Sequence, residues 1–66
     1  MKLLELVGVM NIAEVGVASK TIPGLLQEQM LDMFHLDADP LLRQYGEMEV
    51  ESITNVCKLG VTVWIK

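Results

Sequence analysis

The chain has 66 residues, 52% of them hydrophobic, and a formal net charge of −4 at pH 7. A chain of this length buries only about 60% of the surface that its unfolded form exposes, so we expect one small domain, residues 1–66, with apolar side chains left for contact with another chain. The five basic residues are scattered. Phosphate binding needs clustered Lys and Arg, which argues against nucleic acid and anionic membranes as partners.

Cys57 is the only cysteine and His35 the only histidine. A disulfide within the chain is therefore excluded, and a structural zinc site is disfavoured. Association of copies is the remaining common way for so short a chain to gain stability. The lone thiol fits a reducing compartment, and no uncharged stretch approaches the ~20 residues that cross a bilayer. We expect a cytoplasmic homo-oligomer, at least a dimer, that binds no membrane.

The N-terminal segment, Leu3–Ala18, is rich in β-branched residues and apolar at both odd and even positions. This pattern is typical of strands covered on both faces, and a turn at Met10 would make the segment a hairpin. Residues 2–11 also place apolar side chains three and four apart, so a helix there remains the alternative.

Residues 22–36 predict one amphipathic helix. Pro23 suits its first turn, and apolar side chains recur at a heptad-like spacing. Leu31 falls off the apolar face, so we expect it to be exposed or to contact a partner. The side chains that we expect this helix to place in the core include Met30, Met33 and Phe34.

A second, short helix is predicted after residue 38. Asp39 is placed to cap it, Pro40 suits its first position, and Gly46 is placed to end it.

Residues 47–66 alternate between apolar and polar side chains and predict a β-hairpin. The alternation changes phase near Ser52, which requires a bulge or a turn, and Asn55 is the best candidate for the turn. The side chains expected on the inner face of the last strand are Cys57, Leu59, Val61, Val63 and Ile65. The whole pattern predicts an α+β fold: a small antiparallel sheet, ββαββ-like, with one amphipathic helix and a short second helix.

No group of residues indicates a reaction. Cys57 with His35 would make a nucleophile and a base, but a cysteine on the apolar side of a strand usually behaves as a small buried hydrophobe. The densest group of potential metal ligands is Asp32, His35, Asp37 and Asp39, but this pattern is more typical of a polar helix face that runs into a capping aspartate than of a metal site. A calcium loop starting at Asp37 fails because Leu42 stands where its glycine belongs. We expect no enzyme, no cofactor and no bound metal.

Partner-binding candidates come from the outer side of the hairpin. Trp64 is a large aromatic outside a small sheet, which suits an interface anchor. Three glutamates project from one strand face as an acidic stripe, which is either a solvated face or a surface complementary to a basic groove on another protein. The complete set of candidate partner-binding residues is Trp64, Glu47, Glu49, Glu51, Leu31 and Tyr45.

In size, acidity and lack of catalytic groups the chain resembles, by composition alone, small accessory proteins of bacteriophages and mobile elements. We expect a non-enzymatic, homo-oligomeric inhibitor or regulator that binds and occludes another protein. The alternative is a small-molecule or nucleotide-binding module with its pocket at a subunit interface, where strand glycines would let a ligand approach backbone amides.

Overall fold

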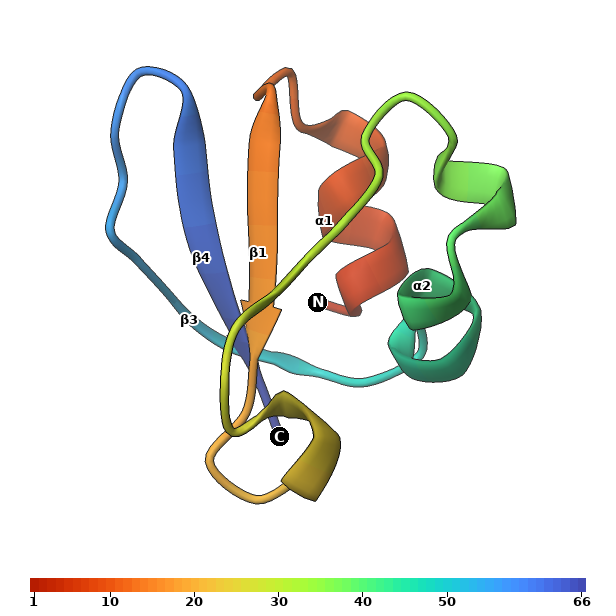
Figure 1. Cartoon of the computed structure of the whole chain (residues 1–66), viewed down its shortest axis with the longest axis vertical. Helices are drawn as coiled ribbons and strands as arrows, with labels where there is room; N and C mark the ends of the chain where they lie inside the picture. Colours follow the sequence, from red (N-terminus) through yellow and green to blue (C-terminus); the bar gives the residue numbers. More distant parts are fainter.

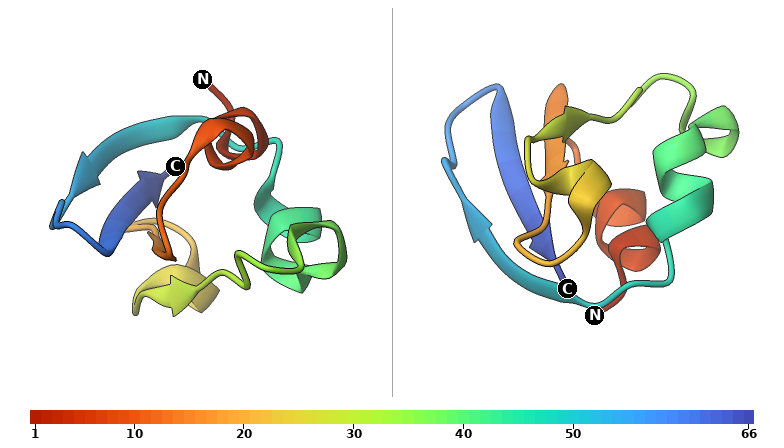
Figure 2. Two further views of the ribbon diagram at one scale, coloured as in Figure 1. Left: turned by 90° about the horizontal axis from the view of Figure 1, so that it is seen from above. Right: turned by 60° about the horizontal axis from the view of Figure 1, so that its bottom comes forward.

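The computed structural model describes all 66 residues and shows a four-stranded sheet with both α-helices on one side of it (Figures 1 and 2). The elements in chain order are α1 (Leu3–Val9), β1 (Glu14–Ala18), the 3-10 turn η1 (Pro23–Leu25), β2 (Gln29–Met30), the 3-10 turn η2 (Leu36–Ala38), α2 (Pro40–Tyr45), β3 (Val50–Thr54) and β4 (Gly60–Ile65). The α+β class is confirmed, and from β1 onward the α-helix and strands follow the ββαββ order. None of the helices has the length and apolar character needed to cross a membrane.

Strands β1 and β4 run parallel in the middle of the sheet, and β2 and β3 flank them as antiparallel edges. The sheet is therefore mixed, which corrects the expected antiparallel sheet. The chain leaves β1, passes through the helical layer at α2 and returns through β3, so β4 enters beside β1 in the same direction (Figure 1). Central parallel strands are normally apolar on the covered face, and here Val15 pairs with Val61 and Val17 with Val63.

The core lies between the sheet and the helices. The buried hydrophobic cluster contains Leu3, Val7, Val15, Val17, Leu25, Leu31, Leu42, Val61, Val63 and Ile65. The inward direction of the last three side chains is confirmed. The predicted inward placement of Cys57 and Leu59 is wrong. Strand β4 begins only at Gly60, and both residues lie exposed in the preceding loop.

The N-terminal segment begins as a helix, which was the alternative to a strand. Helix α1 buries Leu3 and Val7 against the sheet. Its first amide groups are satisfied by the chain that follows α2: Leu3 N–H donates to Met48 O at 2.9 Å, and Leu4 N–H donates to Gly46 O at 2.8 Å. These tertiary acceptors favour the helix where sequence alone left two possibilities. The strand prediction holds only for β1.

Residues 22–36 do not form the expected amphipathic helix. Part of this segment pairs with the edge of β1 as strand β2. Gly16 pairs with Met30, and Leu31 N–H donates to Val15 O at 2.8 Å. Unpaired strand-edge amides and carbonyls need partners, and an extended segment supplies them where a helix would not. Leu31 is consequently buried, whereas Met30 and Phe34 are exposed, which corrects all three placements. Met33 is half-buried.

The short helix α2 is confirmed. Asp39 caps it, with one carboxylate oxygen accepting from Leu41 N–H at 2.8 Å. The other oxygen accepts from Asp32 N–H at 2.6 Å, so the same buried side chain ties α2 to the preceding turn. Pro40 is at the helix start and Gly46 is its C-cap.

The hairpin is also confirmed. A register shift between Val50 and Ser52 marks a bulge close to the expected phase change. Asn55 has φ = 53°, the left-handed conformation that asparagine tolerates better than most residues. Beyond the bulge, Ser52 and Thr54 pair with Trp64 and Thr62.

Core burial predicts a clear stability difference between two valines. Val63 is fully buried, whereas Val56 is 71% exposed in the hairpin loop. Val63→Ala should lower the free energy of unfolding by about 1–3 kcal/mol because it removes buried methyl groups and leaves a cavity. Val56→Ala is the matched control and should leave the urea midpoint nearly unchanged. Equal effects of the two substitutions would contradict the assigned strand register.

The double role of Asp39 gives a second prediction. Asp39→Ala removes the acceptor for two backbone amides, so it should destabilise the protein by about 1–3 kcal/mol, at or above the cost of losing an ordinary helix cap. Asp37→Ala changes the same side chain type at an exposed position and should have little effect. Thermal unfolding of both variants measures the difference, and a mild Asp39→Ala effect would argue against the bridging contacts.

Candidate interaction surface

The face of the sheet turned away from the helices carries Trp64. Its indole N–H donates to Thr54 Oγ1 at 2.7 Å, and Lys20 Nζ lies 5.9 Å from the ring centroid, at the limit of a cation–π contact. These residues line a cavity of about 180 Å³ together with Glu51 and Ser52. The structure thus brings together Trp64 and Glu51, two of the predicted partner-binding residues.

The other two glutamates of the expected acidic stripe face the start of the chain. Lys2 Nζ lies 2.7 Å from a Glu47 carboxylate oxygen, and the Met1 amino group lies 2.9 Å from a Glu49 carboxylate oxygen. The bulge after Val50 separates these two residues from Glu51. The stripe is therefore divided, and only Glu51 lines the cavity beside Trp64.

Leu31 and Tyr45 do not offer freely exposed side chains. Leu31 is 6% exposed and belongs to the core, so the expectation that its side chain is exposed is wrong. Tyr45, the last residue of α2, is half-buried against the same core.

A groove of about 450 Å³, lined mostly by hydrophobic residues, lies between the end of α1 and the segment 33–36. Its apolar lining includes Val7, Met10, Ile12, Met33, Phe34 and Leu36. No charged residue lines it. Phe34 stands at its edge with 88% of its surface exposed, and Val9, also outside the core, is 77% exposed. We call this hollow the Phe34 groove. Sequence reasoning missed it because it assigned Phe34 to the core.

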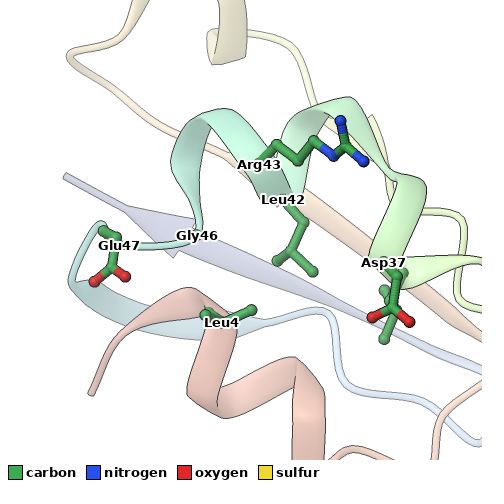
Figure 3. Close-up of a pocket in the computed structure, with 7 residues that line it drawn as sticks. Leu4, Asp37, Leu42, Arg43, Gly46 and Glu47 are labelled. Carbon is green, nitrogen blue, oxygen red and sulfur yellow. The ribbon is translucent and has the colours of Figure 1, made fainter.

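A second cavity, of about 300 Å³, lies between α1 and α2 (Figure 3). Leu4 and Leu42 face each other across its middle, with Glu47 and Asp37 toward opposite ends. The side chain of Arg43 points away from Leu4 (Figure 3). Carboxylates at the ends of an apolar floor can accept a cation, but Glu47 already pairs with Lys2.

The strand glycine Gly16 has a structural role. The Glu28 side chain folds over it, in the space where a Cβ atom would lie, and the Glu28 carboxylate accepts a hydrogen bond from the Thr62 hydroxyl. The close approach that a glycine permits is thus used by this chain's own side chain. The backbone of Gly16 is not open to a ligand.

The residues considered for chemistry are engaged separately. Cys57 Sγ donates to Gly60 O at 3.4 Å, and His35 Nδ1 lies 3.1 Å from Asp32 Oδ2. No group of three or more His, Cys, Asp or Glu side chains is arranged to hold a metal ion. Comparison of the chain with family models, with curated proteins and with solved structures gave no match.

The ion pairs of the N-terminus predict a small pH dependence. The hydrogen bond from the Met1 amino group lowers the pKa of the Glu49 carboxyl. The ion pair therefore stabilises the folded protein above the ordinary glutamate pKa, and this stabilisation is lost as the pH falls through the lowered pKa. The hydrogen bond with Glu47 raises the pKa of Lys2, so its contribution is lost only in the alkaline range. Urea midpoints measured against pH should fall in acid less for Glu49→Gln than for the wild type.

High salt serves as the control for this pH prediction. Both pairs are exposed to solvent, so salt should screen them and reduce the difference between Glu49→Gln and the wild type. A difference that is independent of salt would show that the substitution acts through something other than the ion pair.

Proposed function

We propose that this protein is a non-enzymatic interaction protein that self-associates and acts by binding and occluding another protein. The observation that carries the proposal is the Phe34 groove, where an exposed aromatic ring borders an apolar hollow without charged lining residues. Removing apolar surface from water contributes about 25 cal/mol per Å², so such a surface favours association.

The second surface in the proposal is the Trp64 cavity on the opposite face of the sheet. A tryptophan flanked by Lys20 and Glu51 combines an apolar ring with charges of both signs. Aromatic anchors rimmed by polar groups are common at protein interfaces. We assign this surface to a protein partner, and the proposed role is that of a cytoplasmic inhibitor or regulator, as in the accessory proteins that the composition resembles.

The size of the Trp64 cavity favours a protein partner over a small molecule at that site. Small-molecule sites usually measure about 300–1,000 Å³. The Trp64 cavity measures about 180 Å³. Of the two glycines that lie in strands, Gly16 is covered by Glu28 and Gly60 packs closely against Glu14. Cys57 and His35 contact different partners, Gly60 and Asp32, so no nucleophile–base pair of these two residues supports catalysis over binding.

Self-association is the first arm of the test. Light scattering during size exclusion should give a mass of at least two chains at micromolar to millimolar concentrations. A mass of one chain, 7.4 kDa, over that whole range would contradict the homo-oligomer.

Partner capture is the second arm. The tagged protein, recovered from lysate and measured by native mass spectrometry, should retain a second protein. Glu51→Lys should weaken this capture, because it reverses the charge beside Trp64. Asp37→Lys makes the same change in charge at a distant exposed site and should leave capture intact. A retained small molecule in place of a protein would favour the alternative function.

A further inference from the structure

We infer that the open edge of strand β3 accepts an extended basic segment of another protein, which adds a strand to the sheet and places an arginine beside Glu51. The inference rests on the proposed binding of a protein partner and specifies how the Trp64 surface recognises it. Strand β3 is the last in the sheet order β2-β1-β4-β3 and lies at an outer margin of the molecule (Figure 2). A strand edge with free amide and carbonyl groups is the usual place where a peptide adds to a sheet.

The backbone of Ile53 faces away from the sheet. Lys66 N–H donates to Glu49 O, so even-numbered residues at the end of the chain direct their backbone groups toward β3. Ile53 lies between two residues of β3 that pair with even-numbered residues of β4, and alternation therefore directs its N–H and C=O to the open side. Residues 51–54 are all exposed, and no backbone hydrogen bond joins them to a segment outside the sheet. An added strand would supply the missing partners.

The stretch that leads into β3 already carries an added segment, the start of this chain. Val50 N–H donates to Met1 O at 2.8 Å, and Lys2 forms an antiparallel bridge with Glu49. The positive charges of this segment lie on glutamates of the edge. Lys2 Nζ is 2.7 Å from a Glu47 carboxylate oxygen, and the N-terminal amino group is 2.9 Å from one of Glu49. The edge thus accepts, within its own chain, an extended antiparallel segment that carries positive charge.

Glu51 is the next glutamate along this line and has no charged partner. None of the ion pairs in the structure includes it. Glu51 lies at the bulge of β3 and lines the Trp64 cavity, which measures about 180 Å³. Lys20 lines the same cavity but lies over the Trp64 ring and forms no ion pair. An unpaired carboxylate beside an open strand edge favours an incoming strand with a cation at the matching position.

Arginine suits this position better than lysine. Its guanidinium donates in a fixed fork that matches a carboxylate, and it is more weakly hydrated than an ammonium group. Ser52 and Thr54 line the cavity beside Glu51, and their hydroxyl oxygens can accept from the remaining guanidinium N–H groups. Lys20 limits the segment to one basic residue here, because a second would meet a like charge in the same cavity.

The charge that favours a basic segment disfavours a second copy of this chain at the same edge. Pairing of β3 with the β3 of another copy would place two Glu51 carboxylates in one short ladder, and acidic side chains on an edge normally discourage such pairing. The other edge strand, β2, consists only of Gln29–Met30 and carries no basic residue. The occupant is therefore a segment of another protein, and self-association uses a different surface.

Short peptides with blocked ends test the edge directly. The first alternates Thr and Val and carries one Arg at its centre, the second has Glu in place of Arg, and the third keeps Arg but has N-methylated backbone amides. In NMR spectra of the isotope-labelled full chain, the Arg peptide at millimolar concentration should shift the amide signals of residues 51–54 and the Trp64 indole N–H. It should also slow hydrogen exchange of the Ile53 amide. The Glu and N-methylated peptides should bind at least about five-fold more weakly, because each lacks one of the two contacts.

Two variants separate the charge from the backbone. Glu51→Arg should reverse the order of the Arg and Glu peptides. Ile53→Pro removes the outward N–H at an edge position, where proline is tolerated, and should weaken binding of the Arg peptide. Asp37→Arg makes the same change in charge at an exposed site in η2 and is the matched control, which should leave the order of the peptides unchanged. Circular dichroism of the three variants verifies that the fold is retained.

The outcomes separate this inference from the proposed function. Signal shifts confined to the β3 edge and Trp64, with the reversed preference in Glu51→Arg, support the inference. An unchanged preference in Glu51→Arg, or shifts at another surface, would overturn it and leave the proposed binding of a protein partner standing. Equal binding of the N-methylated peptide would show attraction of charge without strand addition, which also overturns it. Absence of binding by every peptide overturns the inference, and the proposed function fails with it only if the tagged protein also retains no other protein.

Discussion

Strands β1 and β4 come from opposite ends of the chain and pair in parallel, and the other elements are arranged around that pair. The pairing stacks Val15 beside Val61 and Val17 beside Val63, so four apolar side chains meet on one face. Closing so long a loop costs conformational entropy, which burial of these side chains must offset. Strands β2 and β3 then pair with the outer edges of this central pair, and α1 and α2 cover the apolar face of the sheet.

The opposite face of the sheet has no helix over it and is covered by side chains. Glu28 lies over Gly16 and is held by Thr62, while Trp64 is held by Thr54. These hydrogen bonds let the uncovered face keep polar and aromatic groups at fixed positions without a second layer. The Trp64 cavity is a direct result, because the side chains that shield the sheet also leave an ordered hollow between Trp64 and the bulged strand β3.

The surplus of apolar residues could be read from composition, but its location could not. The chain is too short to bury 52% hydrophobic residues, and the structure exposes large apolar side chains such as Val9 and Phe34. Their position depends on the strand β2. Once residues 29–31 pair with β1, the chain leaves the sheet edge toward η2 and α2 (Figure 2), and Phe34 is exposed instead of lying in the core.

The sequence by itself determined the elements whose signals are complete within a few residues. The cap at Asp39, the turn at Asn55 and the inward alternation of Val61 and Val63 are local, and each was predicted. Tertiary structure decided the segments with ambiguous periodicity. Helix α1 forms because the chain after α2 supplies acceptors for its first amides, and β2 forms because the edge of β1 needs partners. A local sequence pattern cannot indicate a hydrogen bond whose donor and acceptor lie far apart in the chain.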